Sequence, residues 1–258
     1  MTRGWAAVLL GWSALGAALP LAGADKAEEK GPKQSFEVTQ TRRVPFQPGG
    51  TIRLENSYGY LSVEGWDEPE VELTVIHSTD RLYEPEEKEK QEQRFEEVRV
   101  ESERRSDQEF AIETSLPRRK NLLSGMLPER RVIVTLPVRS HRGVTLEYRL
   151  RVPRDSRLVV HHDFGYVSVS DVTGDIEVRS HTGDMIVMLP DPGPYAVDAR
   201  TGMGSVSSDL AGRGRKRFLV ATRFTHASGA PARMVRLRMG RGNITIKTGP
   251  ASAASGSN

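Results

Sequence analysis

The chain has 258 residues, a formal net charge of +3 and no cysteine, and its length suits one large domain or two modest ones. The absence of cysteine excludes disulfides, thiolate metal centres and thiol catalysis. A folded domain in this chain must therefore be held together by its apolar core.

Residues 1–24 are predicted to be a secretory signal peptide. Arg3 supplies a positive start, Trp5 to Leu21 carries no charge, and Ala22 to Ala24 fits a small–x–small cleavage site. The alternative is a retained membrane anchor, although this apolar run is short and contains many Gly and Ala residues. We therefore expect export to the periplasm or the cell surface. Residues 25–35 are expected to form a flexible leader.

Short segments of alternating apolar and polar residues follow, which is typical of strands. The predicted strands of this part of the chain are 51–54, 56–63, 71–75, 95–100, 110–112, 132–137 and 144–152. Pro85 and the glutamates around it favour the first turn of a helix, so we expect one short surface helix at 84–94. Residues 117–128 are expected to form a loop.

A repeated phrase dominates the stretch from Leu158 to Leu189. It consists of a glycine, one further residue and an apolar–polar–apolar triplet, and copies begin at Gly59, Gly165, Gly174, Gly183, Gly204 and Gly242. The three central glycines are nine residues apart (174 − 165 and 183 − 174). The triplet places its apolar members on one face of a strand, and the glycine marks a turn with positive φ or close backbone approach. Such a repeat is typical of a solenoid or a tight β-meander.

We expect a single all-β domain over residues 36–248, built as a β-solenoid or β-helix-like stack of short strands. In this prediction each glycine turn sits over the next, and Val, Ile and Leu side chains fill one shared interior. Val167, Ile176 and Ile244 must then be buried. Residues 249–258 are rich in Gly, Ala and Ser and are expected to be a disordered tail.

The chain resembles the bacterial DUF4097 family, also called DUF4098, which carries the label adhesin. The resemblance lies in residues Tyr58 to Asp67, in Leu150 to Pro153, and in the glycine phrases from Phe164 to Met188. It implies an exported or envelope-associated β-solenoid, and it implies no catalytic residue, cofactor or substrate. Residues 84–94 and 117–128 depart from the family pattern.

His161, His162 and Asp163 are adjacent, and His181 and Asp184 follow two turns later. Histidine and carboxylate can bind zinc or another transition metal. Adjacent strand residues point to opposite faces, so His161 and His162 cannot share one site without a bulge. His162 and His181 could meet on neighbouring coils. The alternative, which we favour, is that these are exposed polar residues near a turn, so no metal and no cofactor are expected.

Asp163, Asp175 and Asp184 flank the repeated glycines. Stacked carboxylates build the active sites of some β-helix polysaccharide lyases and hydrolases, where two carboxyl groups must lie about 5–9 Å apart. Aspartate beside glycine is also an ordinary turn residue, and Asn243 in the last phrase fits that role. We therefore predict no catalytic residue. A carbohydrate-active enzyme using these aspartates remains the alternative.

Aromatic residues recur beside the glycines, at Tyr58, Tyr60, Phe164 and Tyr166. They could stack on sugars, but aromatic neighbours on adjacent strands more often form a ladder that fixes register, and we favour the ladder.

The charge of the chain is unevenly distributed. The segment from Glu84 to Glu109 has eleven carboxylates and six basic residues, whereas residues 210–258 have ten basic residues and no carboxylate. A carboxylate-free basic face attracts phosphate or acidic sugar. The alternative is that this face only balances the acidic segment within one molecule. The candidate anionic-ligand face comprises Arg213, Arg215, Lys216, Arg217, Arg236 and Arg238.

These observations predict a non-catalytic, exported envelope module with a binding or structural role. The expected partner is an anionic glycan, a lipid or an envelope protein, because an exported protein rarely meets nucleic acid. After signal cleavage the protein is not expected to be integral to the membrane. A second alternative to binding is a role as an envelope sensor or regulatory partner.

Overall fold

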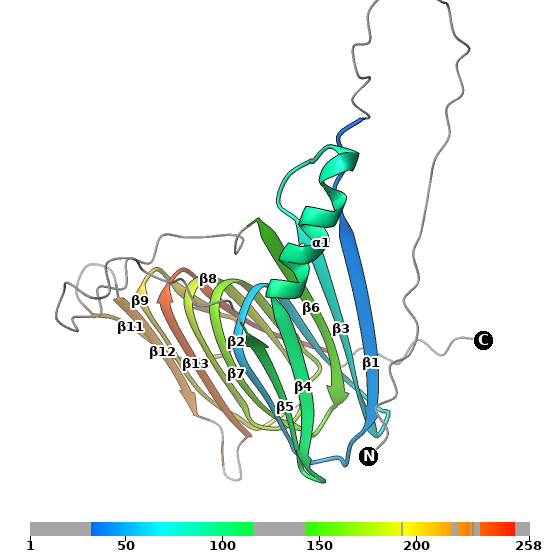
Figure 1. Ribbon diagram of the computed structural model, residues 1–258. Helices are drawn as coiled ribbons and strands as arrows, with labels where there is room; N and C mark the ends of the chain where they lie inside the picture. Colours follow the sequence, from blue (N-terminus) through cyan, green and yellow to red (C-terminus); the bar gives the residue numbers. More distant parts are fainter. Residues whose placement is uncertain are drawn as a thin grey trace, which may run out of the picture.

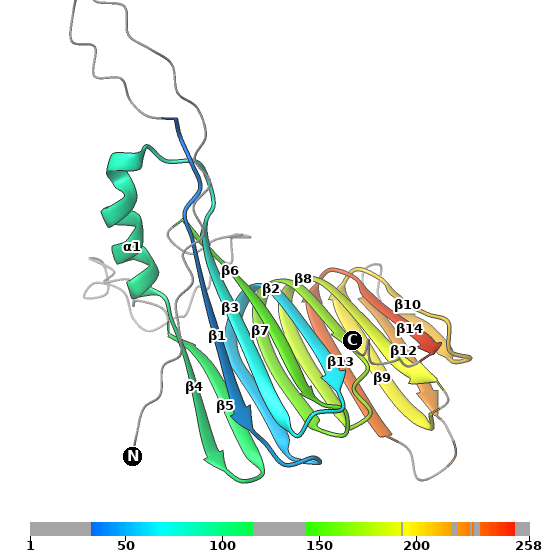
Figure 2. The same cartoon turned by 90° about the vertical axis from the view of Figure 1, so that its right-hand side faces the viewer.

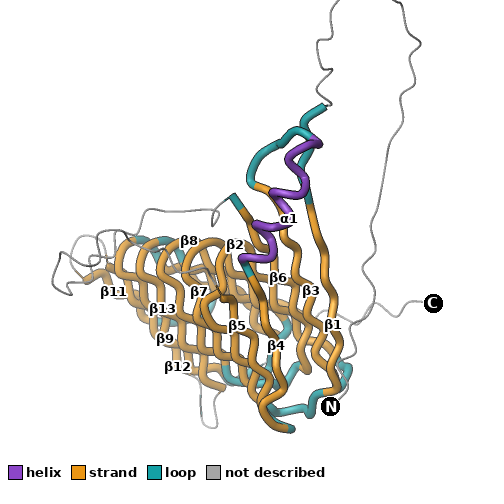
Figure 3. Tube along the Cα trace, viewed as in Figure 1, coloured by secondary structure: helices purple, strands orange, loops and turns teal. Residues whose placement is uncertain are grey.

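The computed structural model describes residues 32–115, 143–191, 193–217, 221–227, 229 and 233–250. In this part of the chain the fold is all-β with one short helix, which confirms the predicted fold class (Figure 3). The predicted signal peptide, the loop at 117–128 and the strand at 132–137 lie outside the described residues.

The strands and helices follow one another in a simple order along the chain. They are β1 (Glu37–Pro45), β2 (Thr51–Trp66), β3 (Glu70–Thr79), η1 (Pro85–Glu87), α1 (Lys88–Glu97), β4 (Arg99–Ser106), β5 (Glu109–Ser115), β6 (Val144–Pro153), β7 (Arg157–Ser170), β8 (Ile176–Asp191), β9 (Tyr195–Met203), β10 (Val206–Ser208), β11 (Arg213–Arg217), β12 (Ala221–Ala227), β13 (Arg233–Arg241) and β14 (Ile244–Pro250).

Three long strands, β2, β7 and β8, run side by side in parallel and take part in two different sets of pairings (Figure 1). Their first halves belong to a layer with the order β4-β5-β2-β7-β8-β13-β9-β12-β11, which we call the first sheet. Their second halves belong to a layer with the order β1-β3-β6-β2-β7-β8-β14-β10, the second sheet.

The apolar residues of the repeated phrases fill one interior shared by both halves of these strands. Val167, Ile176 and Ile244 are 0%, 2% and 0% exposed and belong to the same core cluster. Each strand alternates buried and accessible positions, as the period-two pattern predicts. Burial of these side chains stabilises the domain in the absence of disulfides.

A column of glycines marks the bend between the two sheets. Gly59, Gly165 and Gly183 are register partners on β2, β7 and β8, with φ values of +88°, +126° and +137°. Gly242 and Gly204 continue the column, with φ values of +129° and +139°. A Cβ atom on each of the last four glycines would lie within 2.1 Å of the preceding glycine's carbonyl oxygen. The strands can therefore stack at this bend only with glycine.

The expectation that each glycine turn sits over the next in the chain is wrong for Gly174. Gly183 stacks on Gly165, eighteen residues earlier (183 − 165), so the nine-residue spacing is half of one coil. Gly174 lies between β7 and β8, where a Cβ would come 2.2 Å from the carbonyl oxygen of Ser156. The phrases therefore alternate between the two sheets, because each coil needs two bends to return to its starting layer.

The predicted helix forms as η1 followed by α1, but it continues through Phe95, where we predicted a strand. Phe95 is buried, and its ring centroid lies 6.0 Å from that of His77 on β3. This contact is made from the helix, so β4 begins only at Arg99. Figure 2 shows α1 beside the end of the molecule that carries β1, β4 and β5.

Two features lie close to the predicted limits of the domain. Gln34, in the predicted leader, pairs with Tyr83 through two backbone hydrogen bonds of 2.8 and 2.9 Å. At the other end, β14 extends to Pro250, two residues beyond the predicted boundary at 248.

Candidate anion-binding face

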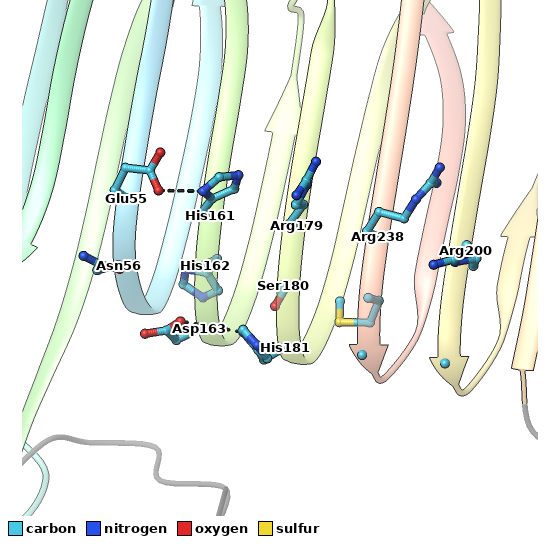
Figure 4. Close-up of a pocket in the computed structure, with 13 residues that line it drawn as sticks. Glu55, Asn56, His161, His162, Asp163, Arg179, Ser180, His181, Arg200 and Arg238 are labelled. Atoms are coloured by element: carbon cyan, nitrogen blue, oxygen red, sulfur yellow. Dashed lines mark hydrogen bonds and ion pairs between the residues drawn. The ribbon is translucent and has the colours of Figure 1, made fainter. Parts of the chain in front are cut away.

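A row of basic side chains crosses the first sheet at right angles to its strands. Each member is the register partner of the next, on the consecutive strands β7, β8, β13, β9, β12 and β11. We call this set the basic row: His161, Arg179, Arg238, Arg200, Arg223 and Arg215. Figure 4 shows the first four of these residues in succession across neighbouring strands.

Strand alternation places the basic row on the outer face of the first sheet. Arg179 lies between buried Val178 and Ser180, and Arg238 lies between buried Leu237 and Met239. The side chain of Arg179 is 58% exposed and that of Arg238 is 26% exposed. The row is therefore accessible to a ligand from solvent.

Two carboxylates in the neighbouring row hold several of these arginines in place. Asp198 Oδ2 accepts a hydrogen bond of 2.5 Å from Arg238 Nη2, and Asp198 Oδ1 accepts one of 3.0 Å from Arg223 Nε. Partial burial acts to raise the pKa of Asp198, but these two bonds hold it below its ordinary value. Glu177 similarly accepts a 2.8 Å bond from Arg179 Nη2. These pairs orient the guanidinium groups.

Arg200 lies between Arg238 and Arg223 in the row and is exposed. Within the described ranges its side chain has no hydrogen bond or ion pair with another residue. A guanidinium group offers five donors and binds carboxylate, sulfate or phosphate oxygens well. Arg215, at the edge of the row, is likewise exposed and without such a partner among the described residues, so Arg200 and Arg215 are the two arginines of the row most available to an anion.

A groove of about 670 Å³ runs along this part of the row, lined by His161, Arg179, Arg238, Arg200 and His181 among others. Gly202 and Gly240, which have no side chains, also line it. His161 Nδ1 lies 2.6 Å from Glu55 Oε2, and His181 Nδ1 lies 3.7 Å from Asp163 Oδ1 (Figure 4). The groove therefore brings three arginines and two histidines together with two carboxylates, Glu55 and Asp163.

The predicted anionic-ligand face is divided between two rows. Arg215 and Arg238 belong to the basic row, whereas Arg213 and Arg236 lie in the neighbouring row, which also contains Glu177 and Asp198. Lys216 and Arg217 are part of β11, where their backbones pair with Thr222 and Ala221.

The face predicted from the sequence did not include four members of the basic row, namely His161, Arg179, Arg200 and Arg223. His161 and Arg179 are eighteen residues apart (179 − 161), which is the length of one coil, but this length is set by the strand pairing and the nine-residue repeat of the glycines does not indicate it. Arg200 and Arg238 meet because β13 lies between β8 and β9, against the order of the chain. No spacing in the sequence indicates this insertion.

The predicted alternative, that the basic face balances the acidic segment of the same molecule, finds no support in the ion pairs of the row. Arg223 and Arg238 pair with Asp198, and Arg179 pairs with Glu177. The acidic segment contributes η1, α1, β4 and β5, and in the first sheet β4 and β11 occupy opposite edges (Figure 1).

The histidines do not form the metal site considered from the sequence. His161 and His162 point to opposite faces, and His162 is buried, with its Nδ1 2.8 Å from Ser57 Oγ. His181 lies on the outer face beside Asp163. Over the residues that the structure describes, no group of three or more His, Asp or Glu side chains is placed to hold a metal ion.

The three aspartates of the enzyme hypothesis do not converge. Asp175 Oδ1 accepts a 2.9 Å hydrogen bond from the backbone N–H of Met234, and Asp184 Oδ1 accepts a 3.0 Å bond from that of Asn243. Each of these two carboxylates therefore accepts a hydrogen bond from a backbone N–H group of the neighbouring coil, close to a bend. Asp163 alone of the three lines the groove. Burial raises the pKa of Asp163, an effect that neighbouring His181 opposes.

Asp184 links two neighbouring coils by accepting the hydrogen bond from Asn243, and this linking role can be tested by substitution. Asp184→Ala removes the acceptor of the Asn243 backbone N–H and is expected to cost about 1 kcal/mol, or about 3 °C in Tm. Asp184→Asn keeps a side-chain oxygen and is expected to lose less than half of that. Thermal unfolding of the two variants checks this, and equal losses would argue against the bridging role.

The aromatic residues form pairs on adjacent strands. Tyr60 and Tyr166 stack with ring centroids 4.7 Å apart, and Tyr58 and Phe164 lie 5.2 Å apart. Tyr58 is fully buried, whereas Tyr60 is 48% exposed. These pairs follow the register of β2 and β7, as expected for a ladder.

Comparisons with known proteins identify no family. No family model matches the chain, and no curated protein matches it. A solved structure of a candidate cell adhesion protein from Clostridium sporogenes is 14% identical with a TM-score of 0.44, and the match covers 82% of this chain and 100% of that one. A candidate adhesin from Bacteroides fragilis is 10% identical with a TM-score of 0.22, over 81% of this chain and 96% of that one.

Proposed function

We propose that this chain is an exported, non-catalytic module of the cell envelope that binds an anionic ligand on the outer face of the first sheet. The observation that carries this proposal is the basic row, in which six consecutive strands each present a basic side chain at the same register. Chance alternation would scatter such charges over the sheet. Their alignment concentrates basic groups along one line of this surface, which favours an anionic ligand there.

The export part of the proposal rests on residues 1–24, whose composition is typical of a signal peptide. No helix among the described residues is long and apolar enough to cross a membrane. The resemblance to the DUF4097 family agrees with a place in the envelope. An acidic glycan or an anionic lipid headgroup is the ligand class that the envelope would offer to this face.

The enzyme alternative has less support, because Asp175 and Asp184 are engaged with the backbone of the neighbouring coil. The sensor alternative has no specific observation in its favour. A binding role needs only the accessible guanidinium groups and the rigid strands that carry them, both of which lie on this face.

The proposal predicts retention of the purified chain on a heparin matrix, weakening as salt increases, because screening shortens the reach of surface charges. Arg200→Glu reverses a charge that has no partner among the described residues, so it should lower the elution salt clearly without breaking an ion pair. Lys247→Glu is the matched control, since Lys247 is exposed on β14 in the second sheet.

Equal elution shifts for the two variants would show that retention reflects overall charge and would count against this face. Failure of the wild-type chain to bind either heparin or anionic vesicles would remove the proposal altogether. Circular dichroism of both variants establishes that the fold is retained.

A further inference from the structure

Resting on the proposed function, we infer that the ligand is a linear polyanionic glycan that lies across the strands, along the basic row. Neighbouring strands are about 4.8 Å apart, so the five intervals of the row span about 24 Å. This spacing gives a regular array of basic groups, five of them guanidinium groups, in single file. A chain with acidic groups repeated along its length can contact many of them at once.

The charges of the neighbouring row favour a linear glycan over a flat anionic membrane as the ligand. It contains Glu177 and Asp198 in register with Arg236, so its charges largely cancel. An anionic membrane would contact both rows and would meet these carboxylates. A glycan strand confined to the basic row meets them only as the groups that orient its arginines.

On the other side of the basic row, the groove leaves space for the sugar rings of the proposed glycan. Gly202 and Gly240 lie beside one another, since a Cβ on Gly202 would come 2.7 Å from the carbonyl oxygen of Gly240. A second hollow of about 350 Å³ continues the groove past these glycines to Met203 and Arg241. Sugar rings can therefore approach the backbone here while their acidic groups reach the arginines.

β11 supplies a matched pair of variants for the test. Arg213 and Arg215 lie two residues apart on this strand and are both exposed, so they share one face of the sheet. Arg215 pairs with Arg223 and ends the basic row, whereas Arg213 pairs with Thr225 in the neighbouring row. Arg213→Glu and Arg215→Glu change the net charge of the protein by the same amount and at the same edge of the sheet. They differ only in the row that loses a positive charge.

The experiment measures the affinity of the purified chain for heparin oligosaccharides of increasing length by titration calorimetry. We expect affinity to rise with length until the row is covered. Arg215→Glu should weaken binding of the long oligosaccharides about ten-fold, as expected for one charge-assisted contact, and should leave the disaccharide unaffected. Arg213→Glu should stay within about two-fold of wild type, the scale of exposed charge effects.

Several results would overturn this inference. They are affinity that does not depend on length, equal effects of Arg213→Glu and Arg215→Glu, or tight binding only to vesicles of phosphatidylglycerol in phosphatidylcholine. In each of these cases the proposed anion-binding function would still hold, but the ligand would bind in a different geometry or would be a lipid headgroup. Absence of binding to both oligosaccharides and vesicles would overturn the inference and the proposed function together.

Discussion

Gly183→Ala is expected to destabilise the protein by about 4 kcal/mol, or to prevent accumulation of folded protein. The φ of Gly183 is +137°, which a residue with a Cβ adopts only under strain. The new Cβ would also lie 1.6 Å from the carbonyl oxygen of Gly165, a backbone atom fixed by the strand pairing of β7 and β8. Strain and overpacking each cost about 1–3 kcal/mol, and here both occur at once.

Gly214→Ala is the control for this substitution. Gly214 also lies in a strand, β11, but a Cβ there would meet no atom within 4 Å. Urea unfolding of the two variants should therefore show a large loss for Gly183→Ala and a change below about 1 kcal/mol for Gly214→Ala. Similar losses in the two variants would mean that the glycine column is not what holds the bend.

The protein is expected to lose about 3 kcal/mol of stability through His162 as the pH falls from 7 to 4. Burial of this side chain, which is 1% exposed, lowers its pKa to about 4, and backbone hydrogen bonds at Gly59 and Phe164 oppose this only in part. The ordinary pKa of about 6.5 applies in the unfolded chain. The unfolded state therefore binds the proton first, and stability is lost between pH 6.5 and about 4.

His162→Gln tests this expectation through the pH dependence of stability. The variant should lose some stability at pH 7, because the hydrogen bond to Ser57 changes. Its further loss between pH 7 and pH 4 should be about 3 kcal/mol smaller than that of the wild type. His181→Gln, at a side chain that is 76% exposed, serves as the control. An unchanged pH profile for His162→Gln would contradict the assignment.

His77 is also expected to lower the stability of the protein as the pH falls, and its contribution is present in both the wild type and the His162→Gln variant. Its pKa is lowered by burial, with a weaker opposing effect from its hydrogen bond to the Val98 carbonyl. The wild type should therefore lose more stability on acidification than His162 alone explains. The difference between wild type and His162→Gln isolates the His162 contribution.

The strands of the repeated phrases could be predicted because their signal is local. Val167, Ile176 and Ile244 alternate with polar residues, and a strand buries alternate positions whatever its neighbours are. The bends at the glycines could also be predicted, since few residues other than glycine adopt the positive φ values of Gly165 and Gly183. The helix was located for a similar reason, from Pro85 and the glutamates that follow it.

The position of Phe95 could not be predicted from local pattern. Its neighbours favour a strand, but contact with His77 on β3 is made from the helix. The stacking of Gly183 on Gly165 and not on Gly174 was also hidden, because the length of one coil depends on how many bends the chain makes before returning to the same sheet.

By itself, the amino-acid sequence determined that this chain forms strands with one apolar face and glycine bends, since backbone conformation and alternation act over a few residues. Only the tertiary structure decided which strands became neighbours, and with them the basic row. Arg200 joins Arg238 because β13 inserts between β8 and β9, and that placement depends on packing among segments distant in the chain. The candidate site belongs to this second level, because its residues are brought together by strand pairing alone.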